Sequence, residues 1–230
     1  SDINNKDMLH YDRKARMNYR GSSSLYNPKR SYAFVSGDKN CDAKKLGEVK
    51  TKKFGMFGAA ANKDWVLYAS YPDATYMRNV LTYHQYAKMT GLWGAKCRYV
   101  ELYVDGSYQG IYVFMDKITQ NKGRVNVEWK VDGSSKGFIV KFDKTDLADR
   151  YEIPNGDQKT FESAMKTGNT GVISYYTEID QRFEIEYPEK EDVIDDGGSW
   201  ADVYTFVKGK IDAFESALKD GDFNTVRSII

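Results

Sequence analysis

The residues best suited to chemistry lie between Arg20 and Arg30, where small and hydroxyl side chains are flanked by basic ones. Backbone N–H groups and hydroxyls of such a turn can cradle phosphate oxygens, and basic side chains add charge-assisted hydrogen bonds. The alternative is an ordinary connection between two strands with solvated charges. The candidate phosphate-binding set is Arg20, Ser22, Ser23, Lys29 and Arg30.

Other reactive side chains are too few or too scattered to predict a second site. The two histidines, His10 and His84, lie far apart, which argues against a His-based metal site or a Ser-His-Asp site. Cys41 and Cys97 match no metal-binding spacing, and a disulfide between them is one possibility. Three nearby carboxylates are interpreted as a solvated loop. They are Asp143, Asp146 and Asp149.

The composition is typical of a globular protein with a sizeable core. The chain has 230 residues, enough for one domain or two small lobes. Its net charge is +1, which does not indicate a nucleic-acid partner. No apolar run approaches the ~18 residues of a membrane helix, so no membrane span is predicted. No signal peptide is recognised, although a targeting segment could have been removed beforehand.

The strongest structural signal is a hairpin over residues 98–118. Asp105-Gly106 tolerates the positive φ angles of a type I′ turn, and both flanks are rich in Val, Tyr and Phe. A two-residue turn with regular pairing predicts Tyr103 opposite Tyr108 and Tyr99 opposite Tyr112. One face of this predicted hairpin then carries Val100, Leu102, Val104, Ile111, Val113 and Met115.

The remaining elements must hold the candidate set and the hairpin together. Strands are predicted over 15–19, 29–35, 64–69, 137–143 and 183–187. Residues 144–181 are expected to be irregular. Helices are predicted over 74–90, with a buried stripe, and over a long segment that Ser199 caps and Gly221 ends. The stripe of the first helix comprises Met77, Val80, Leu81, His84 and Met89. The predicted fold class is α+β.

Several of these segments, taken in order, resemble the CotH kinase family, the spore-coat H proteins and their bacterial relatives with an atypical protein-kinase-like fold. The motifs are YRGSSS, PKRSYAF, YMRNVLTYHQYAKMTG, YVELYVDGSYQGIYVFMDKI and GFIVKFD. The resemblance runs from about residue 15 to residue 230. It implies a polar lead-in over 1–14, a nucleotide-lid lobe (the kinase N-lobe) over 15–118, and a hinge with part of a second lobe over 119–230.

The resemblance also implies a nucleotide site. The strands joined by Arg20 to Ser24 would form the lid over ATP, the Lys29-Arg30 pair would reach the phosphates, and Met115 and Asp116 would border the adenine. The helix at 74–90 holds no Glu or Asp beyond its cap region, so the usual kinase Lys–Glu pair cannot form from it. Mg²⁺ or Mn²⁺ would accompany the nucleotide.

In the family, the catalytic and metal-holding carboxylates lie after the long helix, in an Asn-x-Asp and a Trp-Asp-x-Asp segment. Neither segment follows that helix before Ile230, so catalytic residues are expected beyond Ile230 and none is assigned here. The resemblance implies that the intact protein transfers the γ-phosphate of ATP to Ser or Thr of exported or surface proteins, and that it is secreted or held at the cell surface. The alternatives are a non-catalytic surface, adhesion or coat-assembly module and, on aromatic content alone, a carbohydrate-binding domain.

Overall fold

The computed structural model describes residues 14–21, 23–37, 51–142, 151–152, 173–176 and 182–229. The chain divides into two compact units, Ser1–Asn126 and Val127–Ile230. The first unit therefore extends past the hairpin to residue 126. Ser22, Cys41 and the aspartates at 143, 146 and 149 lie outside the described residues.

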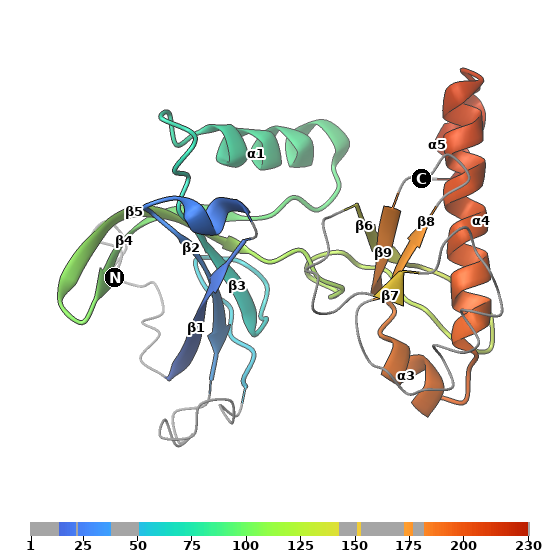
Figure 1. Ribbon diagram of the computed structural model, residues 1–230, viewed down its shortest axis with the longest axis horizontal. Helices are drawn as coiled ribbons and strands as arrows, with labels where there is room; N and C mark the ends of the chain where they lie inside the picture. Colours follow the sequence, from blue (N-terminus) through green and yellow to red (C-terminus); the bar gives the residue numbers. More distant parts are fainter. Residues whose placement is uncertain are drawn as a thin grey trace. The chain divides into compact units, whose positions relative to one another are not determined.

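The first unit is built on a five-stranded antiparallel sheet with the order β1-β2-β3-β5-β4 (Figure 1). Its strands are β1 (Ala15–Arg20), β2 (Ser31–Ser36), β3 (Asp64–Tyr68), β4 (Cys97–Val104) and β5 (Ser107–Asp116). A short 3-10 helix, η1 (Ser23–Tyr26), joins β1 to β2, and helix α1 (Arg78–Thr90) joins β3 to β4. The sheet and its single long helix confirm the predicted α+β class and are compatible with a kinase-like N-lobe.

The β4–β5 hairpin confirms the predicted turn. Asp105 and Gly106 both have positive φ angles, 49° and 78°, and Tyr103 pairs with Tyr108 as expected. The register then shifts by one residue, because Leu102 pairs with Gly110 and Gln109 is left as an extra residue. Gly110 has a φ of 93°, a conformation that side chains other than hydrogen strongly disfavour.

This shift makes the predicted faces of the hairpin wrong. A one-residue change of register moves every later side chain to the opposite face of the sheet. Val100 therefore pairs with Tyr112, and Val113 pairs with Tyr99. Ile111 and Val113 lie on the face opposite to Val100 and Leu102. Val113 is fully buried, whereas Ile111 is 45% exposed.

The two faces of the sheet carry different cores. On one face, which we call the aromatic face, the buried residues are Met56, Trp65, Leu67, Ala69, Tyr112 and Phe114. On the other, the helix face, Val66, Val113 and Met115 pack with Ala95, and Val80 and Tyr83 from α1 cover them. Ring contacts tie the aromatic face together across strands. Phe114 stacks on Trp65 with ring centroids 5.3 Å apart.

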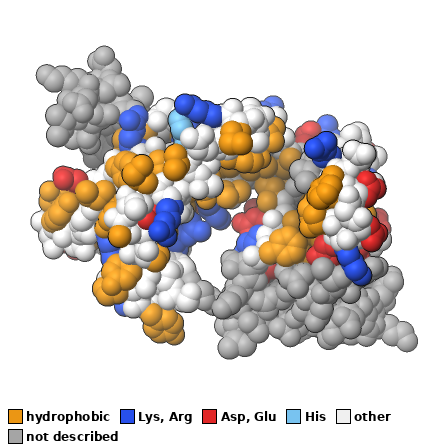
Figure 2. Space-filling view, turned by 90° about the horizontal axis from the view of Figure 1, so that it is seen from above, with side chains coloured by type: hydrophobic (Ala, Val, Ile, Leu, Met, Phe, Trp, Pro, Cys, Tyr) orange, Lys and Arg blue, Asp and Glu red, His pale blue; other side chains and the backbone are white. Residues whose placement is uncertain are grey.

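Helix α1 starts later and turns a different side to the sheet than predicted. It begins at Arg78, whose N–H donates to Asp73 Oδ2 over 2.9 Å, and Gly91 ends it as expected. Met77, Leu81, His84 and Met89 are exposed, so the predicted buried stripe is wrong except at Val80, which packs on the sheet. Figure 2 shows the molecule from above, turned by 90° from the view of Figure 1, with hydrophobic side chains (orange) at the surface. The helix packs through Val80 and Tyr83, a side that shares only Val80 with the predicted stripe.

The second unit packs helices on a four-stranded sheet of order β6-β9-β8-β7. Its strands are β6 (Ile139–Lys141), β7 (Tyr151–Glu152), β8 (Ile173–Tyr176) and β9 (Arg182–Tyr187). β7 and β8 lie in the region predicted to be irregular, and they pair in parallel. Its helices are α3 (Lys190–Asp195), α4 (Trp200–Lys219) and α5 (Phe223–Ile229).

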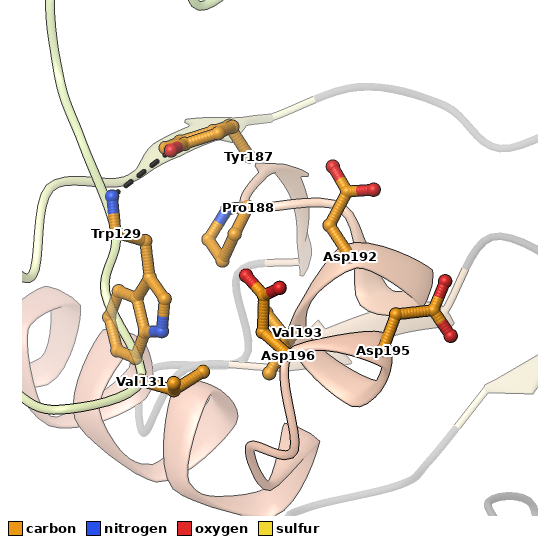
Figure 3. Close-up of a pocket in the computed structure, with 8 residues that line it drawn as sticks. All are labelled: Trp129, Val131, Tyr187, Pro188, Asp192, Val193, Asp195 and Asp196. Carbon is orange, nitrogen blue, oxygen red and sulfur yellow. Dashed lines mark hydrogen bonds between the residues drawn. The ribbon is translucent and has the colours of Figure 1, made fainter.

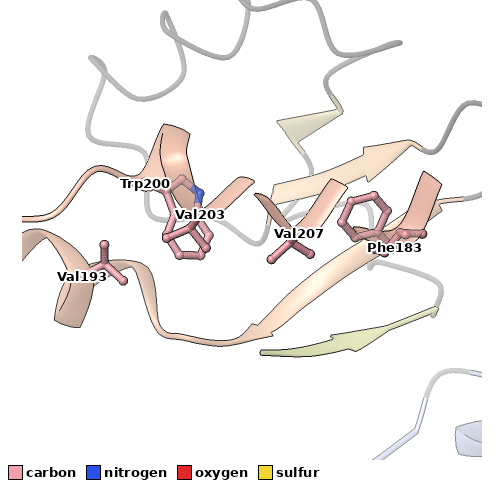
Figure 4. Packing of buried hydrophobic residues seen from close by; sticks show 6 residues of the cluster. Phe183, Val193, Trp200, Val203 and Val207 are labelled. Carbon is pink, nitrogen blue, oxygen red and sulfur yellow. The ribbon is translucent and has the colours of Figure 1, made fainter. Parts of the chain in front are cut away.

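Helix α4 confirms the predicted long helix and organises the core of this unit. The Ser199 side chain accepts a hydrogen bond from the N–H of Asp202, as an N-cap does. Figure 4 shows the residues from β9, α3 and α4 that pack together. The core cluster consists of Phe183, Val193, Trp200, Val203, Val207 and Ile211.

Candidate functional site

The predicted phosphate-binding residues lie at the end of the sheet where β1 and β2 meet. Arg20 is the last residue of β1 and pairs with Ser31, the first residue of β2. Ser23 begins η1, and both Arg20 and Ser23 are exposed. Alternation along β1 puts Arg20 on the helix face, where its charge lowers the pKa of Tyr83 against a larger rise from burial. Tyr19 points to the aromatic face.

Lys29 is held by tyrosines and by the backbone of β5. Its amine donates a hydrogen bond to the carbonyl oxygen of Ile111 and lies 3.4 Å from the Tyr76 hydroxyl. It also stands 4.5 Å from the ring centroid of Tyr112 and 5.0 Å from that of Tyr76. A cation that faces aromatic rings and a carbonyl is stabilised electrostatically. Lys29 therefore ties the start of β2 to β5 and to the segment before α1.

Arg30 is more accessible to a ligand than Lys29 is. Its side chain is exposed, and its guanidinium carbon stands 4.9 Å from the ring centroid of Tyr19. The Arg30 carbonyl oxygen accepts a hydrogen bond from the Tyr112 hydroxyl over 3.1 Å. A guanidinium stacked on a ring keeps its N–H donors free in the plane, where they can meet a phosphate. Lys29 and Arg30 are thus brought together on the aromatic face, and Arg20 lies on the helix face of the same sheet end.

The tyrosines around these basic groups form a connected set that the sequence analysis did not identify. The ring centroids of Tyr19 and Tyr32 are 5.1 Å apart, and those of Tyr32 and Tyr112 are 6.0 Å apart. Burial raises the pKa of Tyr112 to about 12, with further increases from Tyr32 and Tyr19. The Tyr112 hydroxyl therefore stays neutral near pH 7. The sequence hint of this set was the alternation of aromatic residues in β2. The partners of Tyr32 come from other strands, Tyr19 from β1 and Tyr112 from β5.

Met115 and Asp116 lie at the end of β5 on opposite faces of the sheet. Met115 is buried on the helix face. Asp116 is 1% exposed, and its Oδ2 accepts a hydrogen bond from the N–H of Lys96 over 3.1 Å. Its Oδ1 lies 3.1 Å from Nη2 of Arg124, an ion pair without the alignment of a hydrogen bond. Burial raises the pKa of Asp116, and the Lys96 N–H and the Arg124 charge oppose that rise.

Arg124 is a buried residue that the sequence analysis missed. It is 2% exposed, and its Nη1 donates to the carbonyl oxygens of Asp64 and Lys117 over 2.8 and 2.9 Å. Its guanidinium carbon stands 4.7 Å from the ring centroid of Trp65. Arg124 thus joins the start of β3, the end of β5 and the chain that leaves β5. No local pattern around Arg124 indicates this role, because its hydrogen-bond partners Asp64 and Lys117 are 60 and 7 residues away.

The site is basic and aromatic, a combination suited to binding an anion with an attached ring. Among the residues that the structure describes, no group of three or more His, Cys, Asp or Glu side chains could hold a metal ion. The arrangement therefore offers phosphate-binding and stacking groups. The described residues assemble no carboxylate constellation for metal-assisted transfer.

The second unit contains a cavity of about 330 Å³ beside α3 (Figure 3). It is lined by Trp129, Val131, Tyr187, Pro188, Asp192, Val193, Asp195 and Asp196. The Tyr187 hydroxyl accepts a hydrogen bond from the backbone N–H of Trp129 over 3.0 Å, which joins two walls of the cavity. No function was expected for these residues from the sequence.

Comparison with known protein families agrees with the motifs. The sequence profile of the family described as CotH kinase protein matches residues 17–207. The chain therefore belongs to the CotH kinase family, as the ordered motifs indicated. A search of curated proteins found no match. In the part of the chain that the structure describes, no helix is long and apolar enough to cross a membrane.

Proposed function

We propose that this chain binds ATP through the first unit, and that this binding serves transfer of the γ-phosphate to Ser or Thr of exported or surface proteins. The observation that carries the proposal is membership of the CotH kinase family over residues 17–207, a range that includes every predicted phosphate- and adenine-binding residue. The end of the sheet at β1 and β2 would receive the phosphates. Met115 and Asp116 would border the adenine.

The geometry supports distinct roles for the basic residues. Arg20 and Arg30 are exposed at the same end of the sheet but on opposite faces, so each guanidinium would donate two parallel hydrogen bonds to a different phosphate oxygen pair. Lys29 already has partners in Ile111 and Tyr76, so its role is to position the start of β2. Ser22 and Ser23 would add hydroxyl donors from the turn.

Phosphoryl transfer also requires carboxylates that orient the acceptor hydroxyl and hold Mg²⁺ or Mn²⁺. The described residues do not group three such ligands. A metal ion would neutralise charge on the β- and γ-phosphates, and the residues of this chain would bind and orient the nucleotide.

A second candidate is a non-catalytic surface or coat-assembly module with the same fold. The observation that favours it is the exposed apolar side of α1, formed by Met77, Leu81 and Met89. Helix α1 also lacks a carboxylate for the usual kinase Lys–Glu pair. ATP binding distinguishes the two candidates, because an assembly module has no need of the nucleotide.

Calorimetric titration of the whole chain with ATP and Mg²⁺ tests the proposal. The double variant Arg20→Ala/Arg30→Ala should bind ATP at least about tenfold more weakly, because it loses charge-assisted hydrogen bonds. The control variant Lys88→Ala/Lys122→Ala removes two exposed charges from the same unit and should bind as the parent does. Circular dichroism checks that both variants fold. Equal ATP affinity of the parent and the Arg20→Ala/Arg30→Ala variant would refute the proposed site.

A further inference from the structure

The cavity beside α3 combines apolar walls with an acidic side. Trp129, Val131, Tyr187, Pro188 and Val193 supply the apolar walls, and Asp192, Asp195 and Asp196 supply the carboxylates. In Figure 3 the aromatic residues lie opposite α3. The Asp196 carboxylate is on the side of the indole, whereas the Asp195 carboxylate points away from it. Its volume of about 330 Å³ is at the lower end of the range for ligand pockets.

The walls are held in place before any ligand arrives. The Trp129 ring packs edge-on against Phe206 with centroids 5.6 Å apart, and its backbone N–H is bonded to the Tyr187 hydroxyl. Val193 is buried in the core of the unit. A preformed pocket loses little conformational entropy when it binds, so modest contacts can give measurable affinity.

All charged residues that line the cavity are acidic. None of its lining residues is basic, and within the described part of the chain none of the three carboxylates forms an ion pair. The described carboxylates also do not form a group that could hold a metal ion. Spaced carboxylates beside an indole and a phenol ring match an organic cation with an extended, planar charge better than a compact ion.

We propose that this cavity binds an arginine side chain of a peptide or protein partner. The guanidinium would stack on the Trp129 ring and donate hydrogen bonds to Asp196 and Asp192, while the aliphatic stem would contact Val131 and Val193. Arginine fits better than lysine because its planar group can stack and meet two separated acceptors at once. The site is made by the second unit alone, so it does not depend on the proposed nucleotide site.

An NMR titration without nucleotide tests this inference. The probes are a capped Gly-Gly-Arg-Gly-Gly peptide and the same peptide with neutral citrulline in place of arginine, and the reporter is the indole N–H of Trp129 in the whole chain. We expect saturable shifts and about three- to tenfold tighter binding of the arginine peptide, from two partly exposed ion pairs and one cation–π contact.

Two matched variants decide whether the cavity is responsible. Asp192→Asn/Asp196→Asn removes two lining charges and should abolish the preference for arginine over citrulline. Glu189→Gln/Glu191→Gln removes two charges at the start of α3 that do not line the cavity, and it should keep the preference. Equal binding of the two peptides by the parent would overturn the proposal. So would a preference that survives in the Asp192→Asn/Asp196→Asn variant, or one that is lost equally in both variants.

Discussion

Replacing Arg124 by methionine should expose the energetic role of the buried ion pair in the first unit. The change keeps an apolar stem against Trp65 but removes the charge beside Asp116, which is 1% exposed. It also removes the donors to the carbonyl oxygens of Asp64 and Lys117. Loss of one partner from a buried pair typically costs about 3–5 kcal/mol, because the remaining charge is left buried and uncompensated. We expect Arg124→Met to lower the free energy of unfolding of this unit by that amount near pH 7.

The pH dependence separates this mechanism from a simple packing defect. Without Arg124 the pKa of Asp116 should rise further above its ordinary value of 3.8, because burial is then less opposed. A folded-state pKa above the unfolded value means that the folded state binds more protons, so stability rises as the pH falls through that window. The penalty of Arg124→Met should therefore shrink as the pH is lowered from 7 toward 4.

The assay must report on the first unit alone, because a chain of two units need not unfold in one step. Urea unfolding followed by the indole N–H signal of Trp65 satisfies this requirement. Arg98→Met, an exposed arginine on β4, is the matched control and should change stability by less than about 0.5 kcal/mol. A penalty for Arg124→Met below about 1 kcal/mol, or one of the same size at pH 4 and pH 7, would contradict the reasoning.

Three further predictions concern the hairpin and the tyrosines. Met115→Ala, at a buried position, should cost about 2–5 kcal/mol in urea unfolding, whereas Ile111→Ala, at a position 45% exposed, should cost clearly less; equal costs would contradict the observed difference in burial. Gly110→Ala should destabilise the unit by about 1 kcal/mol or more because φ is 93° there, and no loss in the same assay would mean that the register shift does not need glycine. Burial raises the pKa of Tyr112 from 10.0 to about 12, so the free energy of unfolding should fall as the pH rises above 10. This pH dependence should be weaker in Tyr112→Phe, and an unchanged pH dependence would contradict the role of Tyr112.

The sequence alone determined the features that depend on neighbouring residues. Asp105-Gly106 specifies its turn because these two residue types tolerate positive φ angles. Ser199 and Gly221 bound α4 because a hydroxyl caps the first N–H groups and glycine adopts the left-handed conformation. The order of the motifs was also sufficient to indicate the family. The turn and the helix ends depend on residues a few positions apart, and the family resemblance depends on the order of motifs along the chain.

Tertiary structure decided which side chains meet. The extra residue at Gln109 reverses the two faces of the hairpin, and nothing in the alternation of apolar residues marks it. Lys29 reaches Ile111, 82 residues away, and Arg124 reaches Asp64, 60 residues away. The predicted set of basic residues divides between the two faces of the sheet for the same reason. Pairing between distant strands follows from packing of the whole core, so local pattern could indicate the basic loop but could not give the direction of each side chain.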